Sequence, residues 1–471
     1  MRPEKRNGLT NFDVASAANS KFAQVCGNLG CELRVQKRHY KDRFASVLID
    51  SEVRTSVPQV LTNFGIGTLA SSRTVIVAGA GIGGLTAALA CARNGFRALV
   101  LEQAERLEET GAGIQLSPNA TRILIGLGLA ERLRPHVVAP TAIRVLAARS
   151  AREIVRIPLG EYAAQRYGAP YWMIHRGDLQ AALSDAAVQD LNVVVRLGMC
   201  MEDFATHPHG VTISARGSGG LWTEHGNALI AADGLWSASR ARIASKDPPR
   251  FAGRTAWRAL IPAAQVAPEF REPLIHLWLG RNAHLVHYPV KGGKLINVVV
   301  ITADDWSGRG WSEAASRIDL LARLSDTRWA PNAHSLIRAP EAWLKWALYQ
   351  APPLANFGQG AAALLGDAAH AMLPFLAQGA AMAIEDAAVA AQCLARMPDN
   401  PAAAWETYSA VRRGRTRKVQ RLAARNGNHY HLPGVAAMFR NTAMRLTGGE
   451  RLLHHYDWLY DWRPPPALSI S

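Results

Sequence analysis

The chain has 471 residues, of which 49% are hydrophobic and 19% charged, and its formal net charge is +16. This composition is typical of a globular protein with large cores, and no run of eighteen uncharged apolar residues predicts a membrane span, so we expect no stable membrane insertion. The excess of basic residues is scattered along the chain without a basic-aromatic motif, so it predicts no nucleic-acid partner. The five cysteines include no C-x-x-C pair, which predicts a reducing, cytoplasmic location and no metal site.

Residues 1–72 differ from the rest of the chain. They show weak periodicity, mixed charges and no glycine-rich turn before a helix. A charged segment followed by an apolar one is absent, so we expect no secretory signal here. The segment is predicted to be a poorly ordered extension, and we assign no function to it.

A glycine turn follows the strand predicted over residues 74–78. In the G-x-G-x-x-G pattern, Gly79 permits a tight turn, Gly81 lets the backbone approach a pyrophosphate, and Gly84 lets helix and strand pack closely. An alanine-rich helix and a second strand follow, and Glu102 stands at the end of that strand. Its carboxylate suits two ribose hydroxyls and disfavours a 2'-phosphate, so the turn predicts bound NAD or FAD.

Later motifs favour the flavin over the nicotinamide. An aspartate at a strand end suits a ribityl hydroxyl, and backbone N–H groups at a following helix N-terminus suit the O2 edge of a flavin. A simple NAD-binding fold needs no such late element. The relevant residues are Gly113 and Arg122 in "GAGIQLSPNATRIL", Arg176 in "HRGDL", Asp233 in "AADG", Asp367 in "LLGDAAH", and Gly379 and Ala380 in "QGAAMAIEDAA".

In these ordered motifs the sequence resembles the single-component FAD-dependent aromatic hydroxylases, and most closely the salicylate hydroxylase and 3-hydroxybenzoate 6-hydroxylase branch, over about residues 73–462. The resemblance implies that Glu102 binds the adenosine ribose, Arg176 the phosphate-ribityl region and Asp367 the ribityl chain. It implies that Asp233 serves both FAD and a passing nicotinamide. With no second Rossmann domain visible, NADH or NADPH is expected to dock transiently.

The segment from residue 254 to 300 predicts an antiparallel meander. In "HLVHYPV" the period of two puts His284 and Tyr288 on one face, roughly 13 Å apart, and His287 on the other. The resemblance implies that His284 assists deprotonation of a phenol, that Tyr288 orients the ring or its carboxylate, and that the Pro374 carbonyl contacts the substrate hydroxyl. A packing role for His284 is the alternative. Arg258 is either a carboxylate ligand or a structural residue.

The expected fold class is therefore α/β, a Rossmann-like FAD-binding domain with an inserted, mostly antiparallel substrate sheet and C-terminal helices. We expect the first part of the FAD-binding domain at 73–245, the substrate sheet at 246–350, and the second part with the C-terminal helices at 351–471. Trp343 and Trp346 are near helical spacing and are expected in a core.

The activity implied by the resemblance is that of an FAD-dependent monooxygenase. It would use NAD(P)H and O2 to hydroxylate a phenolic aromatic acid through a flavin C4a-hydroperoxide, as a monomer or homodimer. The alternatives are a related flavin epoxidase or ubiquinone-pathway hydroxylase, an NAD-dependent dehydrogenase and a non-catalytic flavin-binding protein. The sequence leaves open the substrate, the choice of NADH or NADPH, and simple or decarboxylative hydroxylation.

Overall fold

The computed structural model describes residues 73–107, 112–306, 312–325 and 328–465, so the predicted N-terminal extension lies outside the described residues. A six-stranded sheet has the order β18-β19-β11-β1-β2-β7, and all of its neighbours pair in parallel except β18 and β19. Its strands are β1 (Thr74–Ala78), β2 (Arg97–Glu102), β7 (Val193–Leu197), β11 (Ala228–Ala231), β18 (Gly358–Gln359) and β19 (Ala362–Leu364).

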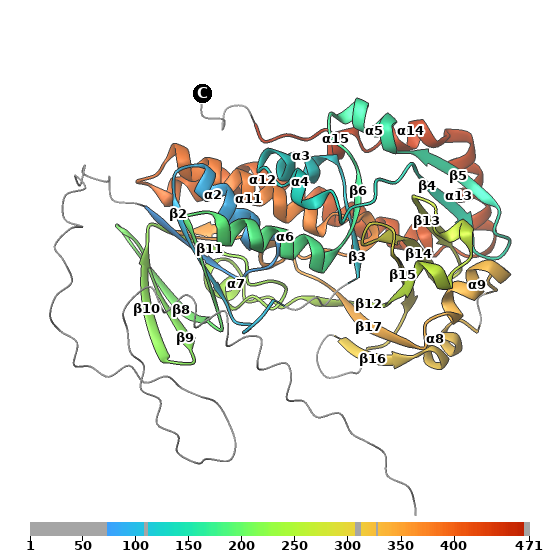
Figure 1. The fold of residues 1–471 in the computed structure, drawn as a ribbon, viewed down its shortest axis with the longest axis horizontal. Coiled ribbons are helices and arrows are strands. Elements are labelled where there is room, and N and C mark those ends of the chain that lie inside the picture. Colours follow the sequence, from blue (N-terminus) through green and yellow to red (C-terminus); the bar gives the residue numbers. More distant parts are fainter. Residues whose placement is uncertain (1–72, 108–111, 307–311, 326–327, 466–471) are drawn as a thin grey trace, which may run out of the picture. The chain divides into compact units, whose positions relative to one another are not determined.

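Helices pack against this sheet through one apolar core. The β1 sequence TVIVA is β-branched and almost wholly buried, as expected of a central parallel strand. Helix α2 is alanine-rich, which lets it lie close to its neighbours α6 and α11, as Figure 1 shows. The helices of this region are α2 (Ile82–Arg93), α3 (Pro118–Gly126), α4 (Ala130–Leu133), α6 (Arg176–Gln189), α7 (Ala238–Ile243), α10 (Asp367–His370), α11 (Gly379–Arg396) and α12 (Pro401–Tyr430).

Two small sheets accompany the parallel one. An antiparallel sheet of order β10-β9-β8 follows β7, and β3 pairs antiparallel with β6. The strands are β3 (Gly113–Leu116), β6 (Trp172–His175), β8 (Cys200–His207), β9 (Gly210–Gly217) and β10 (Gly220–Gly226).

The predicted meander is part of an eight-stranded sheet of order β16-β17-β12-β15-β14-β13-β4-β5. The meander predicted over residues 254–300 is confirmed as β12 to β15. The sheet also takes in β4 and β5, which precede β12 by about a hundred residues, and β4 pairs in parallel with β13. The strands are β4 (Ala142–Ala147), β5 (Glu153–Pro158), β12 (Arg250–Pro262), β13 (Leu274–Leu279), β14 (Ala283–Val290), β15 (Leu295–Ala303), β16 (Ser312–Ser316) and β17 (Ala342–Gln350).

The two faces of this sheet pack differently. One face shares a core with helices α8 (Arg317–Arg323) and α9 (Pro331–Arg338). The opposite face shares cores with the 3-10 turn η3 (Pro374–Leu376) and with helices α11 and α12. The helical spacing of Trp343 and Trp346 was misleading, because both residues lie in β17, although Trp343 is buried as expected. Pairing with β12 decides the conformation of this short run.

The chain ends in further helices. Helix α5 (Gly160–Tyr167) lies in the same core cluster as residues of α14 (Gly449–His454) and α15 (Asp457–Tyr460). Helix α13 (Gly434–Thr447) precedes them.

The 3-10 turns η1 (Ala263–Gln265) and η2 (Pro268–Phe270) follow β12. Among the described residues, none of the helices has both the length and the apolar character that a membrane span requires. The α/β fold class with an inserted sheet and C-terminal helices is confirmed.

Candidate flavin and substrate site

The glycine turn has the geometry that the sequence predicts. Gly79 has φ of +105°, and a Cβ there would lie 2.5 Å from the Ala232 carbonyl oxygen. A Cβ on Gly84 would lie 1.9 Å from the Gly79 carbonyl oxygen, so only glycine allows this helix-to-strand distance. A Cβ on Gly81 would meet no atom within 4 Å. The turn therefore leaves open space beside Gly81, which fits a pyrophosphate at the N-terminus of α2.

Glu102 is held at the opening of this turn. Its two carboxylate oxygens accept hydrogen bonds from the backbone N–H of Ala80, at 2.7 Å, and of Ala104, at 3.0 Å. Because a carboxylate has about four lone-pair positions, the ribose hydroxyls of an adenine dinucleotide have acceptors left. Gln180 of α6, which the sequence did not single out, donates to the Ala80 carbonyl oxygen at 2.8 Å and ties α6 to the turn.

Asp367 is an accessible carboxylate that interacts electrostatically with Arg176. Its side chain is exposed to solvent, although desolvation by the surrounding protein raises its pKa against the lowering effect of His370 and Arg176. Arg176 is the first residue of α6, and Asp178 lies in the first turn.

The N-terminus of α11 faces open space. No side chain caps this helix, and a Cβ on Gly379 would meet no atom within 4 Å. Gly379 and Ala380 therefore present backbone N–H groups at the positive end of an 18-residue helix. The Rossmann turn, the accessible Asp367 carboxylate and this helix end fit a bound flavin dinucleotide.

A buried network that the sequence did not predict holds these elements together. Asp386 accepts hydrogen bonds from the Gly366 N–H at 3.0 Å, from His370 Nε2 at 2.5 Å and from Arg412 Nε at 2.6 Å. These partners outweigh burial and lower the pKa of Asp386 to about 2. Arg412 also donates to Glu385, at 2.5 Å. The turn formed by Gly366 and Asp367, here called the Gly-Asp turn, is thus anchored to α11 and α12.

The period of two sorts the side chains of β14 as predicted. Tyr288 shares a face with His284 and packs against Gly113, where an added Cβ would lie 2.7 Å from the tyrosine ring. Gly113 N–H donates to Asn297 Oδ1 at 2.7 Å, so Gly113 contacts the large sheet. His287 points to the opposite face and stacks on His276 with ring centroids 4.4 Å apart.

Arg258 lies on the same face of the large sheet as Tyr288, the face toward η3, α11 and α12, which we call the inner face. The register pairs Arg258 with Val299 and Val299 with Val286, and residues paired in this way share a face. Burial lowers the pKa of Arg258, and Tyr288 and Arg176 are the charged or titratable groups that act on it. Arg258 therefore interacts electrostatically with both the candidate substrate residue Tyr288 and the candidate flavin residue Arg176.

His284 and Pro374 lie where η3 approaches the sheet. Pro374 is the first residue of η3, and the next residue, Phe375, has its ring centroid 5.6 Å from that of His284. His284 Nδ1 is 2.7 Å from Nε2 of His431, a residue with no signal in the sequence. The roles assigned to His284, Tyr288 and Pro374 stay predictions.

Two predicted cofactor residues have hydrogen-bond partners within the protein. Arg122 donates to the carbonyl oxygens of Trp462, at 2.8 Å, and of Tyr167. Asp233 accepts hydrogen bonds from the Ser237 hydroxyl and the Ser239 N–H at the start of α7, whose N-cap is Ser237. These contacts favour structural roles for both residues, and their part in cofactor binding stays a prediction.

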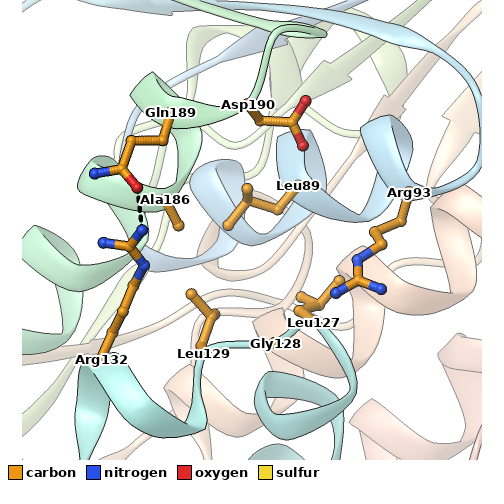
Figure 2. A pocket seen from close by; sticks show the side chains of 9 residues that line it. All are labelled: Leu89, Arg93, Leu127, Gly128, Leu129, Arg132, Ala186, Gln189 and Asp190. Carbon is orange, nitrogen blue, oxygen red and sulfur yellow. Dashed lines mark hydrogen bonds between the residues drawn. The ribbon is translucent and has the colours of Figure 1, made fainter.

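A hollow of about 260 Å³ lies elsewhere (Figure 2). Arg93, the last residue of α2, is in its wall, whereas the glycine turn is at the first residue, about 17 Å away along the helix axis. It is therefore separate from the flavin site. It is lined by Leu89, Arg93, Leu127, Gly128, Leu129, Arg132, Ala186, Gln189 and Asp190.

Comparisons with known proteins identify the family of this chain. A family model described as an FAD binding domain matches residues 72–423. The chain is 37% identical to 3-hydroxybenzoate 6-hydroxylase 1 from Aquipseudomonas alcaligenes over 390 residues, which are 82% of this chain and 97% of that protein. It is 36% identical to the 3-amino-4-hydroxybenzoate 2-monooxygenase PtnB3 from Streptomyces platensis, over 84% of this chain and 97% of that protein.

A solved structure has the same fold. A salicylate hydroxylase in a substrate complex superimposes with a TM-score of 0.70 at 25% identity, covering 83% of this chain and 96% of that one. The predicted flavin cofactor and the predicted enzyme class are thus confirmed. The chain belongs to the FAD-dependent aromatic monooxygenases, an oxidoreductase family whose members use a reduced nicotinamide and O2.

Proposed function

We propose that this enzyme hydroxylates a monohydroxylated aromatic carboxylate. The observation that supports the proposal is that Arg258, His284 and Tyr288 lie on the same face of the large sheet, and that Arg258 interacts electrostatically with the candidate flavin residue Arg176. The three similar proteins described above are named for hydroxylated benzoates or salicylate, which supports the same substrate class.

Arg258 is the proposed carboxylate ligand. Its Nε is buried and has no hydrogen-bond partner among the described residues, while its guanidinium lies over the Trp346 ring, 5.5 Å from the centroid. A buried cationic N–H without an acceptor is costly, and an anionic group of a substrate would supply the missing acceptor. A guanidinium binds a planar carboxylate with two donors, which also fixes the orientation of the ring.

Tyr288 and His284 are the proposed partners of the ring and the phenol. Burial raises the pKa of Tyr288, so its hydroxyl stays protonated and donates a hydrogen bond. Burial and the neighbouring His431 and Arg254 lower the pKa of His284, which favours the neutral imidazole that can accept a proton but also weakens it as a base. Loss of the phenol proton makes the ring carbon ortho or para to it more electron-rich.

FAD, when bound, supplies the redox chemistry with NAD(P)H and O2, and the protein supplies position, electrostatics and exclusion of water. The inner face of the sheet and the loop at Phe375 are rich in apolar side chains, which suits a dry chamber. We propose that residues 246–350, together with β4 and β5, form the substrate-binding unit, and that the coenzyme docks transiently. The three described cysteines are free thiols, which supports a cytoplasmic location.

The test is a panel of 3-hydroxybenzoate, salicylate and 6-hydroxynicotinate, scored by NAD(P)H oxidation, O2 consumption and hydroxylated product. We expect at least one acid to give product in proportion to the NAD(P)H consumed. Flavin binding with no acid-stimulated turnover would support the non-catalytic alternative. A His284→Ala variant should keep its FAD and lose coupled hydroxylation.

Arg258→Gln separates the carboxylate ligand from a structural residue. Loss of a charged hydrogen bond, worth about 1.5–3 kcal/mol, should raise KM for 3-hydroxybenzoate by about 10- to 100-fold. The matched control is 3-hydroxybenzamide, which has the same phenol and no charge, and its KM should change much less. An unchanged KM for the acid would exclude Arg258 as its ligand.

A further inference from the structure

The candidate base His284 is hydrogen-bonded to a second buried histidine. His284 lies on β14, and His431 ends helix α12, 147 positions further along the chain. His284 Nδ1 and His431 Nε2 are 2.7 Å apart, and the two side chains are only 2% and 6% exposed. No other pair of described histidines shares a hydrogen bond of this kind.

The contact is compatible with a basic Nε2 on His284. A hydrogen bond between two neutral imidazoles holds one proton between them, and either ring can donate it. For His284 to accept a proton through Nε2, its own proton must be on Nδ1, where it is donated to His431 Nε2. His431 then has its proton on Nδ1. This is the arrangement that the proposal below uses.

The surroundings do not let a positive charge stay on either ring. Burial, His431 and Arg254 lower the pKa of His284, and burial together with Arg254 and Arg440 lowers the pKa of His431 to about 3. The remaining neighbours are aromatic: Phe375 from η3 and Tyr430 from α12. No carboxylate acts on the pair in the described residues. A proton that reaches this pair is therefore passed on rather than stored.

We propose that His284 and His431 form a two-histidine relay that carries the substrate proton from the active site toward solvent. This inference rests on the proposed function, since it takes His284 as the phenol base. The phenol O–H bond breaks and its proton goes to His284 Nε2. The Nδ1 proton of His284 goes to His431 Nε2, and the Nδ1 proton of His431 goes to water. His431 acts through His284 and is a positioning residue.

Two substitutions separate the two tasks of His431. In His431→Gln the amide oxygen accepts from His284 Nδ1 and keeps its tautomer, but the amide cannot take up and release a proton. In His431→Phe both tasks are lost. The matched control is His287→Gln, another buried histidine of β14, which lies on the opposite face and whose ring nitrogens lack hydrogen-bond partners in the described structure.

The readout is the ionisation of 3-hydroxybenzoate on binding to the oxidised FAD-loaded enzyme, followed as the phenolate difference spectrum in a stopped-flow instrument. Salicylate replaces it if the panel favours salicylate. We expect phenolate formation to slow at least tenfold in both His431 variants, with Kd nearly unchanged in His431→Gln. Added imidazole should restore the rate in a third variant, His431→Ala, whose shortened side chain leaves room for it. The His287→Gln control should match the wild type.

The outcomes of this experiment separate failure of the relay from failure of the proposed role of His284. If His431→Gln forms phenolate at the wild-type rate, the relay is wrong. If the His287→Gln control is as slow as the His431 variants, the loss is a packing effect and the relay is also wrong. If His284→Ala still forms phenolate and hydroxylates normally, the proposed function of His284 itself fails. Slow phenolate formation in both His431 variants with imidazole rescue supports the relay.

Discussion

Replacing Gly84 by alanine tests the close approach of α2 to β1. The added Cβ would lie 1.9 Å from the Gly79 carbonyl oxygen, whereas an ordinary contact is 3.4–4 Å. Backbone must move by more than an ångström, and overpacking of this severity costs about 3 kcal/mol or more. The described body has roughly 380 residues, so at about 2.1 cal/mol/K per residue this cost lowers the Tm by about 4 °C.

Gly81→Ala is the matched control in the same turn. Gly81 has φ of −70° and ψ of 177°, an ordinary extended conformation, and its added Cβ meets no protein atom within 4 Å. The Tm of the apoprotein should therefore stay within about 1 °C of the wild-type value. FAD at a hundred times its Kd stabilises a protein by about 2.7 kcal/mol, and this gain should shrink because the methyl group stands where the pyrophosphate would lie.

Scanning calorimetry of the apoprotein and of the FAD-saturated protein, with flavin fluorescence for the Kd, measures both effects. Gly84→Ala should lower the Tm of both forms. Gly81→Ala should lower only the increase in Tm that FAD causes. An apoprotein Tm for Gly84→Ala equal to that of the wild type would refute the packing argument, and full FAD stabilisation of Gly81→Ala would refute the placement of the pyrophosphate.

Three further predictions concern stability and reactivity. Arg412→Leu leaves two buried carboxylates without this partner and should lower the free energy of unfolding by about 3–5 kcal/mol. Arg73→Ala, at an exposed ion pair, should change it by less than about 1 kcal/mol. Equal losses for the two variants in urea unfolding would contradict this. The folded-state pKa of Asp386, about 2, lies below its ordinary 3.8, so its contribution of about 2 kcal/mol is fully present above about pH 5 and is lost as the pH falls toward 2. Asp386→Asn should therefore reduce the loss of unfolding free energy at low pH. An unchanged dependence of that free energy on pH would contradict this prediction. Native alkylation at pH 8 followed by peptide mass mapping should label the exposed Cys200 and spare Cys91, whose thiol is buried with a pKa raised to about 12; labelling of Cys91 in the native protein would be inconsistent with its burial.

The flavin turn could be predicted because its constraints are local. Gly79, Gly81 and Gly84 act within six residues, and Glu102 is placed by a single helix and strand whose lengths are readable from periodicity. The faces of β14 were also predictable, since alternation alone separates His284 from His287. In each case the physical cause lies within one element or one turn.

The residues that the sequence did not reveal are paired by tertiary structure. The partner of His284 is 147 positions away, and Asp386 meets Arg412 across two helices, so no spacing in the sequence marks either pair. Likewise β4 joins the large sheet by pairing in parallel with β13, which a meander pattern does not encode. Two tryptophans three positions apart fit a helix as well as a strand, and only the pairing with β12 decides.

Helix α12 links the cofactor side of the molecule to the proposed two-histidine relay. Arg412 within it holds the Asp386 network that anchors the Gly-Asp turn, and His431 at its end meets the candidate base. These two positions are 19 residues apart, about 28 Å along the helix axis. A rigid helix of this length gives both contacts one common support. A change that shifts α12 along its axis would therefore disturb the turn at Gly366 and the His284 pair together, whereas a change at either contact alone would not.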